Sequence, residues 1–160
     1  MSADYLVKLY ELPPSEESVR KAEEHGVTIH RAMGLDRGKI LDFVSQNFSS
    51  AWVGECALAL SSQPTTCYIA VQDKKVVGFA CYDATAKGFF GPTGVLERCR
   101  GKGVGTALLY KTLEAMWEAG YGYAAIGWVT DALGFYKKAL NIFEIPGSFP
   151  GVYRHMIDQN

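Results

Sequence analysis

One segment between residues 95 and 109 limits strongly what this chain can fold into. Three glycines, at positions 101, 103 and 105, lie between a β-branched stretch and the helix-forming run Ala-Leu-Leu. Glycine has no side chain and readily adopts positive φ angles, so the segment predicts a tight loop with exposed backbone. The first N–H groups of the following helix lack intrahelical partners and carry partial positive charge. The sequence therefore predicts a phosphate or pyrophosphate site between a strand and a helix.

Two common phosphate-binding motifs do not fit this loop. A Walker loop needs G-x-x-x-x-G-K-[ST], but Leu96 stands at the first glycine position and Gly103 follows the lysine. A dinucleotide fingerprint needs a third glycine, where this chain has Thr106 or Leu108. The pattern that remains is Arg100-x-x-Gly103-x-Gly105. Taken alone, it also fits a glycine-rich turn before an ordinary core helix.

Hydrophobic periodicity predicts an α+β fold with α/β/α layers. A central β-hairpin and a later strand–loop–helix–strand unit favour one single mixed, largely antiparallel twisted sheet flanked by helices. The predicted strands cover residues 5–12, 27–33, 66–72, 76–82, 88–96, 123–129, 142–145 and 151–157. The predicted helices cover residues 15–26, 36–48, 51–60, 104–119 and 132–140, with Ser15 as the N-cap of the first.

The length of 160 residues is typical of one domain. We expect residues 1–160 to form it, with 1–26 as an extra N-terminal strand and helix and 27–160 as the core. The start of the chain lacks the basic and apolar regions of a signal peptide, and no apolar run approaches membrane-spanning length. A cytoplasmic protein is expected.

The balance of charge excludes some classes of partner. Sixteen Lys and Arg residues stand against seventeen Asp and Glu residues. Nucleic-acid binders and polybasic membrane binders rely on clustered positive charge, so neither partner is expected. The four cysteines show no C-x-x-C pair and no histidine at ligand spacing. We therefore expect no metal site and four scattered, reduced core thiols: Cys56, Cys67, Cys81 and Cys99.

In its context the glycine loop resembles the acetyl-coenzyme A signature of the GNAT superfamily of N-acetyltransferases. The residues that carry the resemblance are Arg100-Gly-Lys-Gly-Val-Gly105 and the later Phe135-Tyr136-Lys137-Lys138 on a short helix. The similarity extends from about Val27 to the end of the chain. It implies a GNAT-like acyl-CoA N-acyltransferase fold. It also implies acetyl transfer from acetyl-CoA, as cosubstrate, to a primary amine by direct attack in a ternary complex.

The resemblance also assigns roles to residues. Thr93 and Val95 would lie beside the pantetheine arm, with the Val95 N–H near the thioester oxygen as an oxyanion donor. Tyr136 would act as the general acid for the departing thiolate. Val129 departs from the family pattern, which often has asparagine there. The coenzyme pyrophosphate would bind Arg100, Gly101, Lys102, Gly103, Val104, Gly105 and Thr106.

The sequence leaves the acceptor side open. The acceptor can be a small molecule or a peptide amine, and residues 1–26 would cover the sheet, shape the acceptor site or mediate a homodimer. Aromatic residues facing the cleft would indicate a partly apolar acceptor; the candidates are Trp52, Tyr68, Phe79, Tyr82, Phe89 and Phe90. Candidates by residue type for the general base are Glu55, Asp83 and Glu97, beside the isolated His25, His30 and His155.

Two other functions remain as alternatives. One is a non-catalytic acyl-CoA binding or sensing module on the same fold, which Val129 and the unidentified base suggest. The other is a protein that binds a different phosphorylated ligand through the glycine loop, or a purely structural domain.

Overall fold

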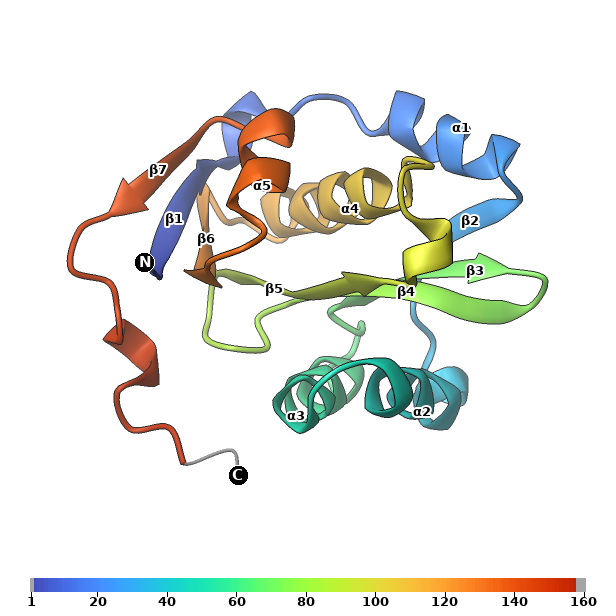
Figure 1. Cartoon of the computed structure of the whole chain (residues 1–160), viewed down its shortest axis with the longest axis horizontal. Helices are drawn as coiled ribbons and strands as arrows, with labels where there is room; N and C mark the ends of the chain where they lie inside the picture. Colours follow the sequence, from blue (N-terminus) through green and yellow to red (C-terminus); the bar gives the residue numbers. More distant parts are fainter. Residues whose placement is uncertain (1, 158–160) are drawn as a thin grey trace.

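The computed structural model describes residues 2–157, in which seven of the eight expected strands and all five expected helices occur in chain order (Figure 1). The strands are β1 (Ala3–Lys8), β2 (Val27–Arg31), β3 (Cys67–Gln72), β4 (Lys75–Tyr82), β5 (Phe89–Val95), β6 (Tyr123–Val129) and β7 (Ile142–Ile145). The helices are α1 (Glu16–Glu24), α2 (Arg37–Asn47), α3 (Ser50–Leu60), α4 (Val104–Glu118) and α5 (Leu133–Ala139). Short 3-10 helices occur at Leu9–Glu11 (η1), Gly34–Asp36 (η2), Glu97–Cys99 (η3) and Gly151–Tyr153 (η4).

The seven strands form one sheet in the order β2-β3-β4-β5-β6-β1-β7. The pair β5–β6 is parallel, and the other neighbouring pairs are antiparallel. Parallel neighbours need a long crossover connection, and α4 supplies it here. The expected mixed, largely antiparallel sheet is confirmed.

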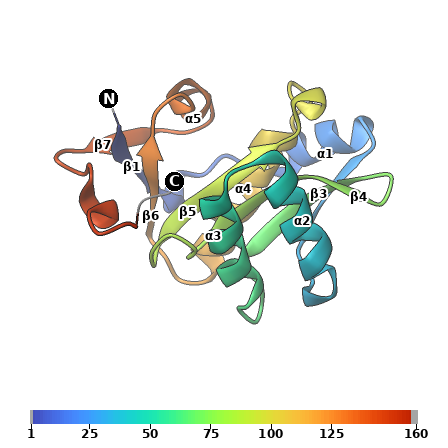
Figure 2. The ribbon, with the colours of Figure 1, turned by 60° about the horizontal axis from the view of Figure 1, so that its bottom comes forward.

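Helices cover both faces of the sheet. Figure 2 shows α2 and α3 across one face, where Ile40, Val44 and Phe79 belong to one apolar cluster. On the opposite face α4 packs its fully buried Leu108 and Leu113 over the strands, with α1 against α4 (Figure 1). The α/β/α layering that the hydrophobic pattern predicts is therefore present.

The strands β5 and β6 stay together for only two residues. Phe89 pairs with Ala125 and Phe90 with Ile126. Beyond this point β5 continues as Gly91-Pro92, and proline has no N–H to donate to a neighbouring strand. The two strands then separate, which leaves an opening in the middle of the sheet.

A β-bulge shapes the other side of this opening. Gly127 and Trp128 of β6 stand opposite the single residue Asp4 of β1, so β6 carries one extra residue. Trp128 has a φ of 51°, and its backbone N–H donates to the buried Asp4 carboxylate at 2.9 Å. This contact fixes the direction in which β6 leaves β5.

Three local expectations from the sequence are wrong. Ser15 has helical φ and ψ angles and does not cap α1; its buried hydroxyl instead donates to Glu114 at 3.0 Å. The expected first strand ends at Lys8, because Leu9–Glu11 turns as a 3-10 helix. The expected strand over 151–157 is absent, since Gly151 has a φ of 54° and η4 begins there.

Gly94 in β5 is required by packing. A Cβ atom at this position would lie 2.5 Å from Cζ of Phe48, whose ring packs against Trp52 and Phe79. We predict that Gly94→Ala lowers the free energy of unfolding by about 1–3 kcal/mol, because the aromatic cluster has to shift. Urea unfolding measures this change. Gly38→Ala, in open space within α2, is the control and should be neutral or stabilising. Equal stability of Gly94→Ala and wild type would contradict the packing argument.

Candidate functional site

A cavity of about 1620 Å³ lies at the opening between β5 and β6. Its lining includes the start of α4 and residues of α5 from one face of the sheet, and α3 and the η4 segment from the other. The cavity therefore passes through the sheet where the two strands diverge. Its volume exceeds the roughly 300–1,000 Å³ of ordinary small-molecule sites, so a long ligand and a second molecule fit together.

The glycine loop forms one end of this cavity. Gly101 and Gly103 have φ angles of 75° and 81°, which only glycine adopts readily. The first N–H group of α4 that donates a hydrogen bond to a preceding carbonyl is that of Ala107, which donates to Gly103 at 2.9 Å. Within residues 2–157 the N–H groups of Val104, Gly105 and Thr106 have no acceptor. These free donors make the loop an anion site.

The wall of the cavity along β5 also offers backbone donors. Leu96 N–H bonds to the Val77 carbonyl of β4 at 2.9 Å, and Gly78 is the register partner of Val95. Because N–H groups alternate in direction along a strand, Val95 N–H points away from β4. On that side β6 has already diverged, so this N–H faces the cavity.

Tyr136 of α5 reaches the cavity from the core. It is 6% exposed and packs edge-on against Phe90, with ring centroids 6.3 Å apart. Its hydroxyl has no hydrogen-bond partner among the described residues. Burial raises the pKa of this hydroxyl above its usual value, so it stays protonated at neutral pH.

Most of the site residues that the sequence proposes meet at this cavity. Lys102 and Val104 are the two that do not line it, and the side chain of Val104 is buried in the core. The backbone N–H of Val104 nevertheless belongs to the free donors at the start of α4. The residues that line the cavity are Thr93, Val95, Arg100, Gly101, Gly103, Gly105, Thr106 and Tyr136.

The structure separates the candidates for the general base. Glu55 of α3 lines the cavity, and burial raises the pKa of its carboxyl group. Asp83 is occupied elsewhere, because it accepts hydrogen bonds from Tyr121 and from Gly88 N–H. Glu97 is exposed on η3 outside the cavity. Among the histidines, only His155 belongs to the lining.

A model of the acetyltransferase (GNAT) family matches residues 37–141. This chain belongs to the GNAT family. The match includes the glycine loop, the diverging strands and α5, but not β1, α1, β2 or β7. No curated protein matches the chain.

Solved structures show the same fold at low sequence identity. A GCN5-related glucosamine N-acetyltransferase region of a fungal multi-domain β-N-acetylglucosaminidase gives a TM-score of 0.72 at 13% identity, over 89% of this chain and 20% of the other. A GCN5-related N-acetyltransferase from Sphaerobacter thermophilus gives 0.66 at 20% identity, over 89% and 48%. An aminoglycoside acetyltransferase from an uncultured soil metagenomic sample gives 0.54 at 18% identity, over 72% and 88%. This chain thus spans a fifth and about half of the first two proteins.

Several residues that line the cavity were not identified from the sequence. Lys21 of α1 lines the cavity beside Gly103, where a Cβ atom would lie 3.1 Å from its side chain. Trp128 and Tyr153 line it as well. Of these three residues, only Lys21 could have been suspected from the sequence, because it is a basic residue on the first predicted helix. Of the aromatic residues proposed for the acceptor side, Trp52 and Phe90 line the cavity, and the other four do not.

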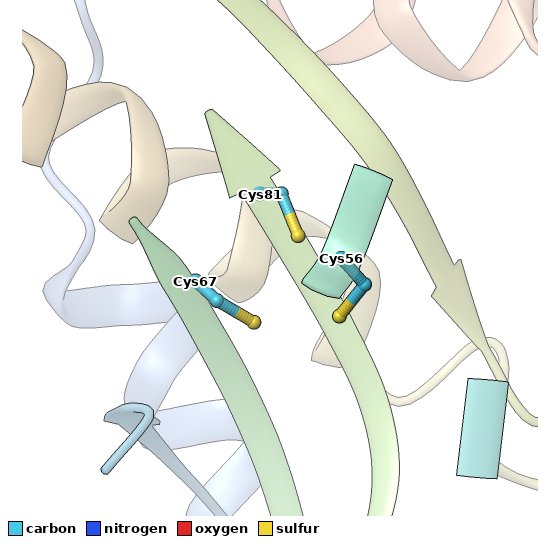
Figure 3. Close-up of side chains that lie close together, drawn as sticks. All are labelled: Cys56, Cys67 and Cys81. Atoms are coloured by element: carbon cyan, nitrogen blue, oxygen red, sulfur yellow. The ribbon is translucent and has the colours of Figure 1, made fainter. Parts of the chain in front are cut away.

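Three cysteines that are separated in the sequence lie close together in the fold. The thiols of Cys56, Cys67 and Cys81 lie within 4.8 Å of one another, on α3, β3 and β4 (Figure 3). The expectation that they are scattered is therefore wrong, because β3 and β4 pair Cys67 directly with Cys81. Three thiols can hold a thiophilic ion. All three are fully buried among apolar side chains, which also fits reduced thiols that pack as small hydrophobic groups.

The helices in the described residues 2–157 include none that is both long and apolar enough to cross a membrane.

All four cysteines are buried, so a reagent in solution does not reach their thiols in the native fold. We predict that a thiol-reactive disulfide reagent modifies no cysteine of the native protein within minutes and modifies four after unfolding in guanidinium. Absorbance of the released chromophore counts the reactive thiols. Rapid modification of one thiol in the native protein would contradict the buried arrangement.

Proposed function

We propose that this protein is an N-acetyltransferase that moves the acetyl group of acetyl-CoA to a primary amine. The observation that carries the proposal is one continuous cavity with free backbone N–H groups at two places. Val104, Gly105 and Thr106 offer donors at one end, and Val95 offers a donor along the wall. Membership of the GNAT family supports the same reaction.

The pyrophosphate of acetyl-CoA would bind the glycine loop. Backbone N–H groups at the helix start bind anions without side chains, and each bond to a charged group contributes about 1.5–3 kcal/mol. Arg100 and Lys21 add positive charge at this end of the cavity. The pantetheine arm would then run along β5, past Thr93 and Val95, toward the opening in the sheet.

The chemical step needs an oxyanion donor and a proton donor. A neutral amine attacks the thioester carbonyl, and negative charge develops on its oxygen, where the Val95 N–H can stabilise it. The tetrahedral intermediate collapses as the C–S bond breaks. Tyr136, which burial keeps protonated, would give its proton to the departing thiolate. The nitrogen loses its extra proton in the same collapse, and this proton restores Tyr136.

Calorimetry with coenzyme A and thiol release from acetyl-CoA test the proposal together. We expect coenzyme A to bind in preference to ATP, and thiol release to require an added amine. Binding without thiol release across a broad panel of amines would favour the non-catalytic acyl-CoA module. Binding of ATP in preference to coenzyme A would favour a site for another phosphorylated ligand.

Gly103→Glu places a carboxylate beside the proposed pyrophosphate and a side chain at a φ of 81°. We predict that coenzyme A binds this variant at least about 100-fold more weakly, since like charges repel and the loop is strained. Gly103→Ala separates the two causes and should weaken binding less. Gly38→Glu, exposed on α2, is the control for charge. Unchanged affinity of Gly103→Glu in calorimetry would remove the loop from the site.

Tyr136→Phe removes a hydroxyl that has no hydrogen-bond partner among residues 2–157, so folding should be unaffected. We predict that turnover falls at least about tenfold, while affinity for coenzyme A stays the same, because only the proton donor is lost. Pre-steady-state thiol release measures the chemical step. Wild-type turnover under these conditions would exclude Tyr136 as the general acid.

A further inference from the structure

The acceptor must approach from the face of the sheet that α3 covers. The donor end of the cavity uses the starts of α4 and α5 on one face. The opposite end is lined by α3, by Ala84 and Thr85 after β4, by the bulge of β6 and by the η4 segment. We call this opposite end the acceptor chamber. Figure 1 shows α3 on the other side of β5 from α4.

One carboxylate serves the acceptor chamber. Glu55 is half-buried and accepts a hydrogen bond from Thr85. Among the described residues the cavity lining holds one other Asp or Glu, Asp131, which follows β6 just before α5 and so lies outside the elements that define the chamber. Within residues 2–157 no Lys or Arg side chain lies at ion-pair distance from Glu55. Because burial raises the pKa of Glu55, this carboxylate is a stronger base than an exposed one. A half-buried carboxylate without a cation suits an ammonium group.

Apolar side chains form a large part of the acceptor chamber. Trp52 lines it from α3, and four further apolar side chains line it although they remain substantially exposed. Their exposed fractions are 55% for Leu58, 41% for Trp128, 54% for Val152 and 46% for Met156. Exposed apolar side chains gathered around one cavity indicate a binding surface for an apolar group.

Tyr153 joins the C-terminal segment to the chamber wall. A Cβ atom on Gly127 would overlap the Tyr153 hydroxyl, so a larger residue there would displace this ring. The ring also packs on Trp128, with centroids 5.0 Å apart. Burial, with the negative charges of Asp4 and Glu55, raises the pKa of Tyr153, so its hydroxyl stays neutral. The chamber therefore has one carboxylate, one imidazole (His155) and an aromatic wall.

We propose that the acceptor is a primary monoamine with an apolar, preferably aromatic body, whose ammonium group contacts Glu55. This inference rests on the proposed acetyl transfer. The body would lie against Trp52, Leu58 and Trp128. A polyamine or an aminoglycoside carries several cations and needs several carboxylates. Among the described residues the chamber supplies Glu55, and the whole cavity adds only Asp131.

Glu55 then has a second task. An ammonium ion has no lone pair, so one proton must leave before the nitrogen attacks. Glu55 takes this proton: the ammonium becomes a neutral amine, and the carboxylate becomes a carboxylic acid. The amine forms the C–N bond as the C–S bond breaks, and Glu55 later releases its proton to solvent. Overall, ammonium and acetyl-CoA give amide, coenzyme A and one proton.

The first test measures binding and turnover with 2-phenylethylamine, spermidine and kanamycin. We expect calorimetry to show 2-phenylethylamine binding to the protein saturated with coenzyme A. We also expect its kcat/KM for acetylation to be at least about tenfold above that of the two polycations. Absence of binding of 2-phenylethylamine, or a preference for either polycation, would overturn the proposal that the acceptor is a monoamine. Acetylation of a polycation would leave the proposed acetyl transfer intact, whereas failure of coenzyme A to bind would overturn both.

Two variants test the two parts of the chamber. Glu55→Gln should lower kcat with 2-phenylethylamine about 100-fold with unchanged affinity for coenzyme A, since the proton acceptor is lost. Glu97→Gln, an exposed carboxylate outside the cavity, is the matched control. Leu58→Lys should raise KM about tenfold with little change in kcat, because it brings a second cation to the ammonium. Leu35→Lys, 88% exposed and outside the cavity, is its control. Wild-type kinetics of both chamber variants would overturn the proposal.

Discussion

The separation of β5 from β6 is the feature on which the site depends. Two parallel strands that continued to pair would use their N–H groups on each other and close the sheet. Here pairing ends after Phe90, where Gly91-Pro92 interrupts β5 and the bulge at Trp128 turns β6 aside. The Val95 N–H is thereby left without a strand partner, and the cavity connects the two faces of the sheet.

The opening divides the proposed reaction between two layers of helices. The layer with α4 and α5 offers free backbone donors for phosphate and the buried Tyr136 hydroxyl. The layer with α3 offers Glu55 and apolar side chains. An anionic coenzyme and a cationic amine would thus enter environments of opposite character and meet where the sheet is open. Positioning of two reactants in this way accounts for a large part of the rate of a two-substrate reaction.

The first residues of the chain contribute to the site as well as to the sheet. β1 lies between β6 and β7, and its Asp4 carboxylate holds the bulge of β6 in place. α1 packs on α4 and brings Lys21 beside the glycine loop. Of the roles considered for residues 1–26, these contacts support a part in shaping the site. The family model covers residues 37–141, so it does not include β1 or α1.

Local chemistry explains what the sequence by itself determined. The positive φ angles of Gly101 and Gly103, the helix start at Val104 and the apolar periods of the layers follow from residue type and spacing over short distances. The fold class could be predicted on that basis, and the family from the resemblance of the glycine loop and of Phe135-Tyr136 to the family's motifs. Eight of the ten site residues proposed from the sequence line the cavity. The tertiary structure alone decided that Glu55 reaches the cavity while Asp83 and Glu97 do not, and that three cysteines meet. It also placed Trp128 and Tyr153, since a bulge and a 3-10 turn arise from contacts with Asp4 and Gly127. Such contacts join residues more than twenty positions apart, and no short-range pattern of residues records them.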